Sequence, residues 1–437
     1  MTNTINSNIR ENLKLGIQKH KEKHFNEAIN HYEYVIKIDP SIVFAHYNLG
    51  LIHEKLGNIE KAKKNYQMAI KVKPLFVNPY NNLGIISQQQ GQKEKAIEYF
   101  EKVVELDPKN LHGYNNIGLV YASLGEYEKA LESYFKSLAI DKANIVAVKS
   151  IIFLMTYCRS NINHPLINAN NDLRLLQKKF VLSDLLKIEN LRLILKNSLN
   201  IINELSINID NFKFSETQAY RRNPIDLNCE YHHKVFNQSK IIPKFCFSCF
   251  KIQIEPHNVI GLIRLFFIFD NLNLNKNNQR KCMVEFRNNV SGVYKGLIYC
   301  SSFDEAKKIL EDITPLLEKN LKFKIDIKRG CSEFYNLFPN YKITQSVEKD
   351  YMNYNKTWKE IEKNTEIVKN FNSIKLNHSI PGLSISDFLI IVQWLNYARI
   401  IGDLTYKQIN LDFFNSNFIK YKLFNQVEFR KKEFNNN

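Results

Sequence analysis

The sequence lacks the features that mark transmembrane, secreted and phosphate-binding proteins. Its longest apolar run, 145–157, is interrupted by Lys149 and Ser150 and is too short to span a bilayer. The first ten residues are polar and contain no apolar stretch of a secretory signal, so we expect a cytoplasmic chain without membrane insertion. Only 14 glycines occur in 437 residues, and none of them forms a phosphate-binding loop.

Motifs of common enzyme classes are also missing. The sequence contains no Gly-x-Ser-x-Gly elbow and no His-Glu-x-x-His zinc helix. Two cysteines are candidates for a catalytic nucleophile: Cys331, which is close in sequence to Glu333, and Cys229, which is close to His232. Neither pair has a recognisable third catalytic group. The sequence therefore favours a non-enzyme. A transferase, or an iron–sulfur or thiol redox enzyme, is the alternative.

The composition predicts folded domains. Hydrophobic residues make up 44% of the chain and aromatic residues 12%, which is enough for sizeable cores. A chain of 437 residues exceeds what one core normally organises, so we expect two or three domains. The net charge is +17, and most of the excess follows residue 149. Such an excess favours acidic or phosphate-rich partners, although AT-rich coding also enriches a chain in Lys and Asn.

A period of 34 residues runs through the first third of the chain. Each unit carries, at a fixed register, a glycine, then an alanine, then an aromatic residue four positions after the alanine. These residues are Gly16, Gly50, Gly84 and Gly118; Ala28, Ala62, Ala96 and Ala130; and Tyr32, Tyr66, Phe100 and Tyr134. Pro40, Pro74 and Pro108 close the first three units, and Lys142 takes that place in the fourth. A unit of this length is a helical pair that buries its apolar face only by stacking on neighbouring pairs.

This pattern resembles the tetratricopeptide repeat family across residues 9–144. The resemblance implies an all-α solenoid whose first helices line an inner surface for an extended peptide. The four repeats would be 9–42, 43–76, 77–110 and 111–144. We therefore predict a scaffold or adaptor that binds a protein or peptide segment.

One register of the first helices carries an asparagine in three of the four repeats. Asn48, Asn82 and Asn116 occupy it, and Lys14 takes that place in the first repeat. By similarity to long tetratricopeptide superhelices, such asparagines can bond the backbone of a bound segment. The alternative is that their amides bond water or the adjacent repeat. Both interpretations remain open from the sequence.

The 34-residue period is lost after residue 144. The apolar segment 145–157 predicts a capping helix, 161–170 a polar linker, and 173–205 two further helices. The segment 206–242 has little periodicity and predicts a long loop with one strand. The predicted regions after the repeats are 145–205 with the cap and helices, 206–341 as a second domain, and 342–437 as a C-terminal helical region.

The second domain shows an ordered series of strand and helix patterns. In sequence, these are a strand at 247–255, a helix at 257–270, strands at 281–287 and 293–299, a helix from Ser302, and a strand at 322–328. This β-α-β-β-α-β order is typical of ferredoxin-like α+β domains. Pro315 is expected to interrupt the second helix.

Helical patterns return near the C-terminus. They cover 347–371 and 386–401, the second ending at Gly402, and 430–437 is expected to be frayed. The fold class predicted for the whole chain is multidomain, with a tetratricopeptide solenoid, a ferredoxin-like domain and C-terminal helices.

Seven cysteines in a cytoplasmic chain favour core thiols, metal ligands or redox groups over disulfides. In a ferredoxin-like sheet, the starts of the first and second strands meet the ends of the third and fourth. Five cysteines fall at these positions: Cys246, Cys249, Cys282, Cys300 and Cys331. Cys282 shares its side of the strand with apolar neighbours and is expected in the core.

The remaining thiols suggest a metal site with two alternative ligand sets. Cys229-x-x-His232 together with Cys246-x-x-Cys249 forms one zinc-type set. The Cys246-x-x-Cys249 pair could instead be completed by Cys300 and Cys331, as a four-thiolate zinc or iron–sulfur site. A set of buried core thiols without a metal is the third interpretation.

RNA binding is a further alternative for this domain. RNA-recognition motifs share the same β-α-β-β-α-β order, and 295–299 weakly resembles their third strand. Leu297 replaces the aromatic residue that would stack on a base, so the sequence favours this function less than metal or protein binding.

Overall fold

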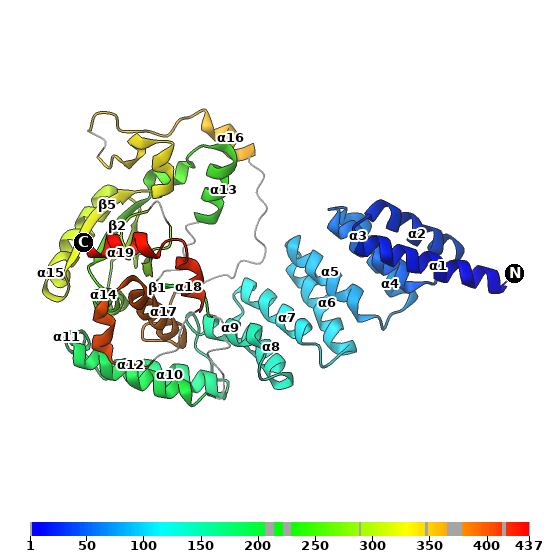
Figure 1. The fold of residues 1–437 in the computed structure, drawn as a ribbon, viewed down its shortest axis with the longest axis horizontal. Helices are drawn as coiled ribbons and strands as arrows, with labels where there is room; N and C mark the ends of the chain where they lie inside the picture. Colours follow the sequence, from blue (N-terminus) through cyan, green and yellow to red (C-terminus); the bar gives the residue numbers. More distant parts are fainter. Residues whose placement is uncertain are drawn as a thin grey trace. The chain divides into compact units, whose positions relative to one another are not determined.

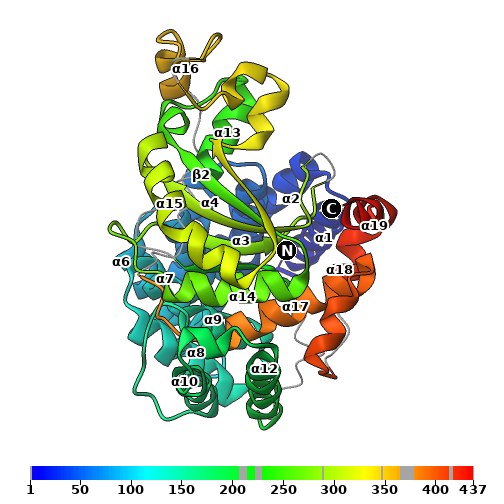
Figure 2. The same cartoon turned by 90° about the vertical axis from the view of Figure 1, so that its left-hand side faces the viewer.

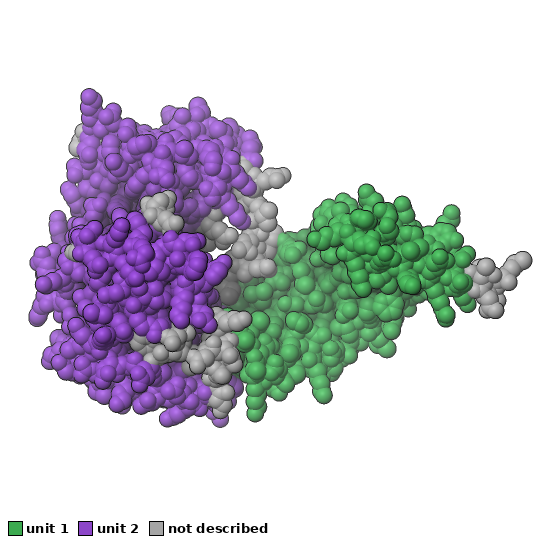
Figure 3. All heavy atoms as spheres, viewed as in Figure 1, with its two compact units in different colours: residues 1–151, 369–375 green, residues 152–368, 376–437 purple. Residues whose placement is uncertain are grey.

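A computed structural model of the chain separates into two compact units (Figures 1 and 3). The structure describes residues 2–205, 214–221, 229–287, 290–345, 348–364, 378–412 and 417–436. The described part of the first unit is 2–151, and the described remainder belongs to the second unit. Within these ranges, no helix is both long and apolar enough to cross a membrane.

The first unit consists of paired helices. The first helices of the pairs are α1 (Thr2–Lys21), α3 (Val43–Lys55), α5 (Val77–Gln89) and α7 (Leu111–Leu124). The second helices are α2 (Phe25–Ile38), α4 (Ile59–Val72), α6 (Lys93–Leu106) and α8 (Tyr127–Ile140). The helix α9 (Ile145–Leu154) follows the last pair. The predicted helical solenoid is confirmed.

The glycine of each first helix packs against the aromatic ring of the second helix in the same pair. A Cβ atom added at Gly50 would lie 2.4 Å from Cε1 of Tyr66, and one added at Gly84 would lie 2.5 Å from Cε1 of Phe100. Both rings are fully buried. The recurring glycines are therefore a packing requirement, because the close approach of the helices leaves no room for a methyl group.

The second unit contains a five-stranded antiparallel sheet (Figure 2). The strands are β1 (Gln218–Arg221), β2 (Phe250–Pro256), β3 (Arg280–Val284), β4 (Tyr294–Cys300) and β5 (Phe323–Arg329). Their order across the sheet is β1-β3-β4-β2-β5, and every neighbouring pair is antiparallel. The helix α14 (Val259–Asn271) connects β2 to β3, and α15 (Phe303–Asn320) connects β4 to β5. The order of elements agrees with the predicted series.

A long apolar helix, α17 (Ile385–Ile401), packs against α14 and the edge of the sheet. Its Trp394 is fully buried and donates a hydrogen bond to the Thr217 carbonyl at 2.8 Å. It ends at Gly402, which has a left-handed backbone, as the sequence predicts. The core of the second unit thus lies between this helix, α14 and the sheet.

Shorter elements complete the second unit. The helices are α10 (Pro165–Lys178), α11 (Leu182–Leu185), α12 (Ile188–Asn203), α13 (Cys229–Ser239), α16 (Trp358–Asn364), α18 (Asn417–Leu423) and α19 (Val427–Asn435). The 3₁₀ helices are η2 (Lys244–Ser248), η3 (Ser332–Asn336), η4 (Pro339–Lys342) and η5 (Leu404–Ile409).

Several predicted boundaries are wrong. The linker ends at His164, because its side chain caps α10 by accepting a hydrogen bond from the Leu166 N–H. The helix α15 continues through Pro315, because Ile313 and Leu317 on either side are buried against the sheet. The segment predicted as a loop contains α13, whose Val235 is fully buried.

The C-terminal predictions also need correction. Within the described part of 347–371, only α16 is helical. The terminus predicted to fray includes most of α19, because the fully buried guanidinium of Arg430 donates to the carbonyls of Val290 and Arg287. The sequence between the strands predicted at 281–287 and 293–299 suits a hairpin loop, and these residues lie partly outside the described ranges.

Candidate functional site

The first helices of the last two repeats have an unusual surface chemistry. Neither α5 nor α7 contains an Asp, Glu, Lys or Arg. They carry five asparagines instead, of which Asn115 is buried and the other four are at least partly exposed: Asn78, Asn81, Asn82 and Asn116. An amide side chain offers both donors and an acceptor without a net charge. This surface can therefore form hydrogen bonds without selecting a ligand by charge.

The structure shows what the predicted asparagines contact. Asn48 donates to the Phe44 carbonyl in its own helix at 2.8 Å, and Asn116 donates to Oδ1 of Asn81 in the preceding repeat at 3.2 Å. Asn82 hydrogen-bonds the hydroxyl of Tyr47 in the preceding repeat. These bonds use only part of what each amide offers.

Lys14, which holds the same register in the first repeat, is exposed on α1. Its neighbours Arg10, Lys19 and Lys21 make the helix basic. The predicted binding positions thus differ in charge between the first repeat and the last two.

Three of the predicted metal ligands lie at one end of the sheet. Phe250 at the start of β2 pairs with Cys300 on one side and with Arg329 on the other. The Gly330 N–H donates to the Cys249 carbonyl at 2.7 Å. The register therefore places Cys249, Cys300 and Cys331 near the same end.

Four thiols from three segments interact electrostatically there: Cys229, Cys246, Cys249 and Cys331. Burial raises the pKa of Cys246, and the charges of the other three thiols raise it further. Burial raises the pKa of Cys249 to about 12, against the lowering effect of Lys251. Cys300 adjoins this cluster through Cys249, and burial raises its pKa to about 12.

Two other residues weighed from the sequence are buried. Cys282 is buried opposite Gly296 in the middle of β3, in agreement with the predicted core position. The buried ring of His232 stacks on Phe245, with ring centroids 5.1 Å apart. The next residue, His233, is the one that hydrogen-bonds the Cys331 thiol.

Cys331 is the centre of a polar group at this end of the sheet. Ligand atoms of His233, Cys331 and Glu333 all lie within 4.8 Å of one another, and no other such trio of His, Cys, Asp or Glu occurs in the described ranges. Nζ of Lys251 is 3.8 Å from Sγ of Cys331. Arg287 forms an ion pair with Glu333.

The charges around Cys331 shift its pKa and those of its neighbours. Burial alone would raise the pKa of Cys331, but Lys251 and the hydrogen bond with His233 lower it below its ordinary value. That hydrogen bond raises the pKa of His233. Burial opposes ionisation of Glu333, and Arg287 nevertheless holds its pKa below the usual range. The group therefore favours anionic forms of Cys331 and Glu333 beside the cations Lys251 and Arg287, and it also favours the protonated form of His233.

Sequence reasoning did not select His233, Lys251 or Glu333 as metal-site residues. The signal for His233 was its four-residue spacing from Cys229, which places both on one face of a helix. That signal was hidden because the segment was interpreted as a loop. Lys251 gave no signal, since a lysine in a strand normally faces solvent.

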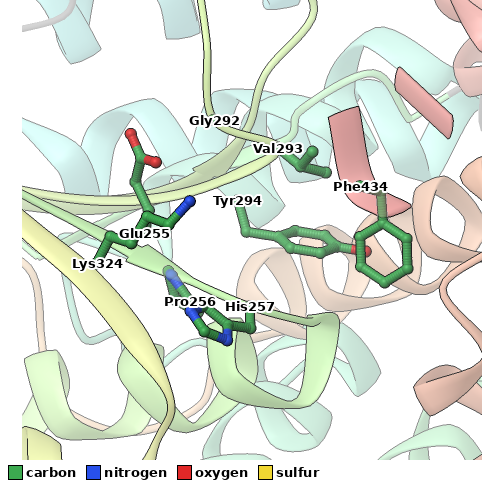
Figure 4. A pocket seen from close by; sticks show the side chains of 8 residues that line it. All are labelled: Glu255, Pro256, His257, Gly292, Val293, Tyr294, Lys324 and Phe434. Carbon is green, nitrogen blue, oxygen red and sulfur yellow. The ribbon is translucent and has the colours of Figure 1, made fainter. Parts of the chain in front are cut away.

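A small pocket lies at the opposite end of β2 (Figure 4). It is lined by Glu255, Pro256, His257, Gly292, Val293, Tyr294, Lys324 and Phe434. Its volume is about 20 Å³, which suits one water molecule and excludes an organic substrate. A larger and more open pocket of about 460 Å³ lies between the start of α14 and the end of α15, and Arg264, Glu318 and Gln408 are among its lining residues.

Family models match only the first unit. The tetratricopeptide repeat model matches 43–75, 77–110 and 113–144, and a second TPR repeat model matches 19–57. The repeat family predicted from the sequence is confirmed. No curated protein matches the chain.

Solved structures similar to this chain cover about a third of it. A crystal structure of MamA is 27% identical, with a TM-score of 0.32, and the match covers 34% of this chain and 81% of that chain. A second MamA structure is 29% identical, with a TM-score of 0.30 and coverages of 32% and 81%. The first TPR of Spaghetti (RPAP3), bound to the HSP90 peptide SRMEEVD, is 20% identical, with a TM-score of 0.26 and coverages of 27% and 94%.

Proposed function

Because residues 19–144 are tetratricopeptide repeats, we propose that the first unit is a scaffold that binds an extended protein segment along its first helices. The observation that carries this proposal is the uncharged, amide-rich chemistry of α5 and α7. The main chain of an extended segment presents one donor and one acceptor at each residue. Asparagine amides can bond to these main-chain groups, so binding depends little on the side chains of the ligand.

A displayed library of random peptides, panned on the full chain, tests this proposal. We expect the double variant Asn82→Ala, Asn116→Ala to bind the selected peptides roughly tenfold more weakly, because their backbone groups lose hydrogen-bond partners. The matched control is Asn65→Ala on the second helix α4, whose amide donates to the Lys61 carbonyl of its own helix. Peptides that bind the double variant and the wild type equally would contradict the proposal.

The asparagines also bond between repeats, so the folding of the double variant must be measured separately. Thermal unfolding followed by far-ultraviolet circular dichroism serves this purpose. Loss of peptide binding with an unchanged transition assigns the amides to the ligand. Loss of stability with unchanged peptide affinity assigns them to contacts between repeats, as in the alternative interpretation.

For the second unit, we propose a ferredoxin-like domain over 250–329, extended by β1 at the edge of the sheet. The supporting observation is the antiparallel strand order β3-β4-β2-β5 combined with the β-α-β-β-α-β order of elements. In this topology the start of the first strand meets the ends of the third and fourth. The fold therefore accounts for the position of the cysteines.

We also propose that the second unit binds a metal ion at this end of the sheet. The support is that four thiols from three segments interact there. Thiolates bind both zinc and iron–sulfur clusters. The test is the content of zinc and iron per chain, with a visible spectrum, in untagged protein purified under nitrogen. Stoichiometric metal is expected, and a folded chain without either metal would contradict metal binding.

A further inference from the structure

We propose that His233, Cys331 and Glu333 hold a zinc-class divalent cation at the cysteine end of the sheet. This inference rests on the metal binding proposed above and names the ligands. It differs from the ligand sets predicted from the sequence, because it uses one thiolate, one imidazole and one carboxylate. These are the three ligand types that zinc accepts in proteins.

The separation of the three ligand atoms supports one shared ion. They lie within 4.8 Å of one another. Ligands about 2.0–2.3 Å from a tetrahedral zinc ion are roughly 3.5 Å apart, so small side-chain rotations bring the set to bonding distance. In the described ranges, the other thiols of the cluster do not form a trio this close.

Two segments supply the ligands, and their packing fixes them relative to each other. Cys331 and Glu333 lie at the start of η3, directly after β5. His233 lies on α13, where the next turn carries Phe236. The rings of His233 and Phe236 both contact Phe334 of η3, at centroid distances of 5.8 and 4.6 Å. The site is therefore held by a packed aromatic contact rather than by a long loop.

The turn before Cys331 is also fixed. Gly330 has φ +57°, and an added Cβ would clash with the Tyr341 hydroxyl, so this backbone position requires glycine. The Tyr341 hydroxyl in turn donates to the Cys246 carbonyl at 2.5 Å. These contacts set the direction in which the chain leaves β5. Cys246 and Cys331 both pack in the apolar cluster around Phe334 and Tyr341.

The charges of the ligands match a divalent cation. A thiolate and a carboxylate contribute two negative charges, and a neutral imidazole adds none. Lys251 and Arg287 contact Cys331 and Glu333. Partners of this kind orient the ligand side chains.

Three protein ligands leave one tetrahedral position open. All three side chains are half-buried, and that of Glu333 keeps 28% of its surface exposed. A water molecule or a small ligand can therefore complete the coordination. Catalytic zinc sites have three protein ligands and one open position, whereas structural zinc sites have four protein ligands.

Titration of the metal-free, untagged full chain with Co²⁺ tests the ligand set. We expect one equivalent to bind, with tetrahedral d–d bands and a sulfur-to-cobalt charge-transfer band of single-thiolate intensity. Cys331→Ser should abolish the charge-transfer band. His233→Ala and Glu333→Gln should each weaken Co²⁺ binding by at least about tenfold. The matched control is Cys158→Ala, which removes a thiol bonded to the Leu154 carbonyl.

Two other outcomes overturn the inference in different ways. Binding with the intensity of several thiolates, lost in Cys246→Ser and Cys249→Ser but not in His233→Ala, would overturn this ligand set and keep the proposed metal binding. Absence of Co²⁺ and Zn²⁺ binding, in a chain with native circular dichroism and tryptophan fluorescence, would overturn both.

Discussion

Arg221 carries a positive charge into the interior of the second unit. Its guanidinium contacts both carboxylate oxygens of Asp387, at 3.0 and 3.1 Å, pairs with Asp270, and lies 4.6 Å from the centre of the Phe266 ring. Burial opposes its charge, but the two carboxylates raise the pKa of Arg221 above its ordinary value. The three side chains join β1, α14 and α17.

We expect Arg221→Met to destabilise the second unit by about 3–5 kcal/mol, because two buried carboxylates lose their cation. Urea unfolding followed by tryptophan fluorescence measures the change, since Trp358 and Trp394 both belong to this unit. The control is Arg192→Met, an exposed arginine that donates to the Gln408 carbonyl. A loss below about 1 kcal/mol would show that Arg221 is not required for the packing of these elements.

Glu285 gives the second unit a dependence on acid pH. Burial raises its pKa, but hydrogen bonds from Arg287 and Lys295 outweigh burial and lower the pKa from 4.5 to about 2. A carboxylate with a lowered pKa stabilises the fold above pH 4.5 and loses this contribution as pH falls toward 2. The contribution is at most about 3 kcal/mol, and burial of Lys295 reduces it by lowering the pKa of that amine.

The measurement compares wild type with Glu285→Gln by urea unfolding at several pH values. We expect the difference in unfolding free energy to be largest near pH 7 and to shrink steadily below pH 4.5. The direction follows from the sign of the pKa shift, since the wild type loses the ionised carboxylate in acid and the variant never has it. A difference that stays constant down to pH 3 would show that Glu285 is not ionised in the fold.

At the scale of the residue, the sequence could not show which of two adjacent histidines lies beside Cys331. His232 and His233 are adjacent and chemically equal, so the spacing of Cys229-x-x-His232 was the only criterion available. The choice depends on the helical phase of α13, which packing of Phe236 on Phe334 determines. Lys251 is a similar case, because its proximity to Cys331 depends on the pairing of β2 with β5.

At the scale of the element, helices and strands were predictable where apolar residues recur at a regular spacing. The repeat register, the helices α14 and α15, and the strands β2 to β5 all follow from apolar periodicity and capping residues. Packing that overrides local preference was not predictable. The apolar face of α15 maintains the helix through Pro315, although proline removes one backbone hydrogen bond.

Gly84 allows a direct test of how a repeat is packed. We expect Gly84→Ala to destabilise the third repeat by about 1–3 kcal/mol, because the new methyl group meets the Phe100 ring at 2.5 Å. Hydrogen exchange of 77–110, measured by mass spectrometry on the full chain, reports the local opening free energy. The control is Gln89→Ala at an exposed position of the same helix α5.

The double variant with Phe100→Leu isolates the contact. If the clash with the ring is the cause, Gly84→Ala will destabilise the Phe100→Leu background less than the wild type, and the double variant will lose less stability than the sum of the two single variants. If Gly84→Ala destabilises both backgrounds equally, the glycine is required by the local backbone and not by contact with the Phe100 ring.

At the scale of the whole molecule, the two compact units differ in architecture, and we propose a different function for each. The repeats are a stack in which each pair contacts its neighbours, and their stability is a sum of local terms. The second unit is built on a single sheet. The ligands of its proposed metal site come from α13 and from the segment that follows β5. A ligand of the second unit should therefore stabilise that unit alone.

This separation predicts a selective effect of zinc. With free zinc at about 100 times its dissociation constant, the second unit should gain about 2.7 kcal/mol of stability, whereas the repeats should gain none. Tryptophan fluorescence follows the second unit, since both tryptophans lie there, and hydrogen exchange of 43–140 follows the repeats. The variant His233→Ala should lose the shift in fluorescence. Equal stabilisation of both units by zinc would mean either that their folding is coupled or that the metal binds in the repeats.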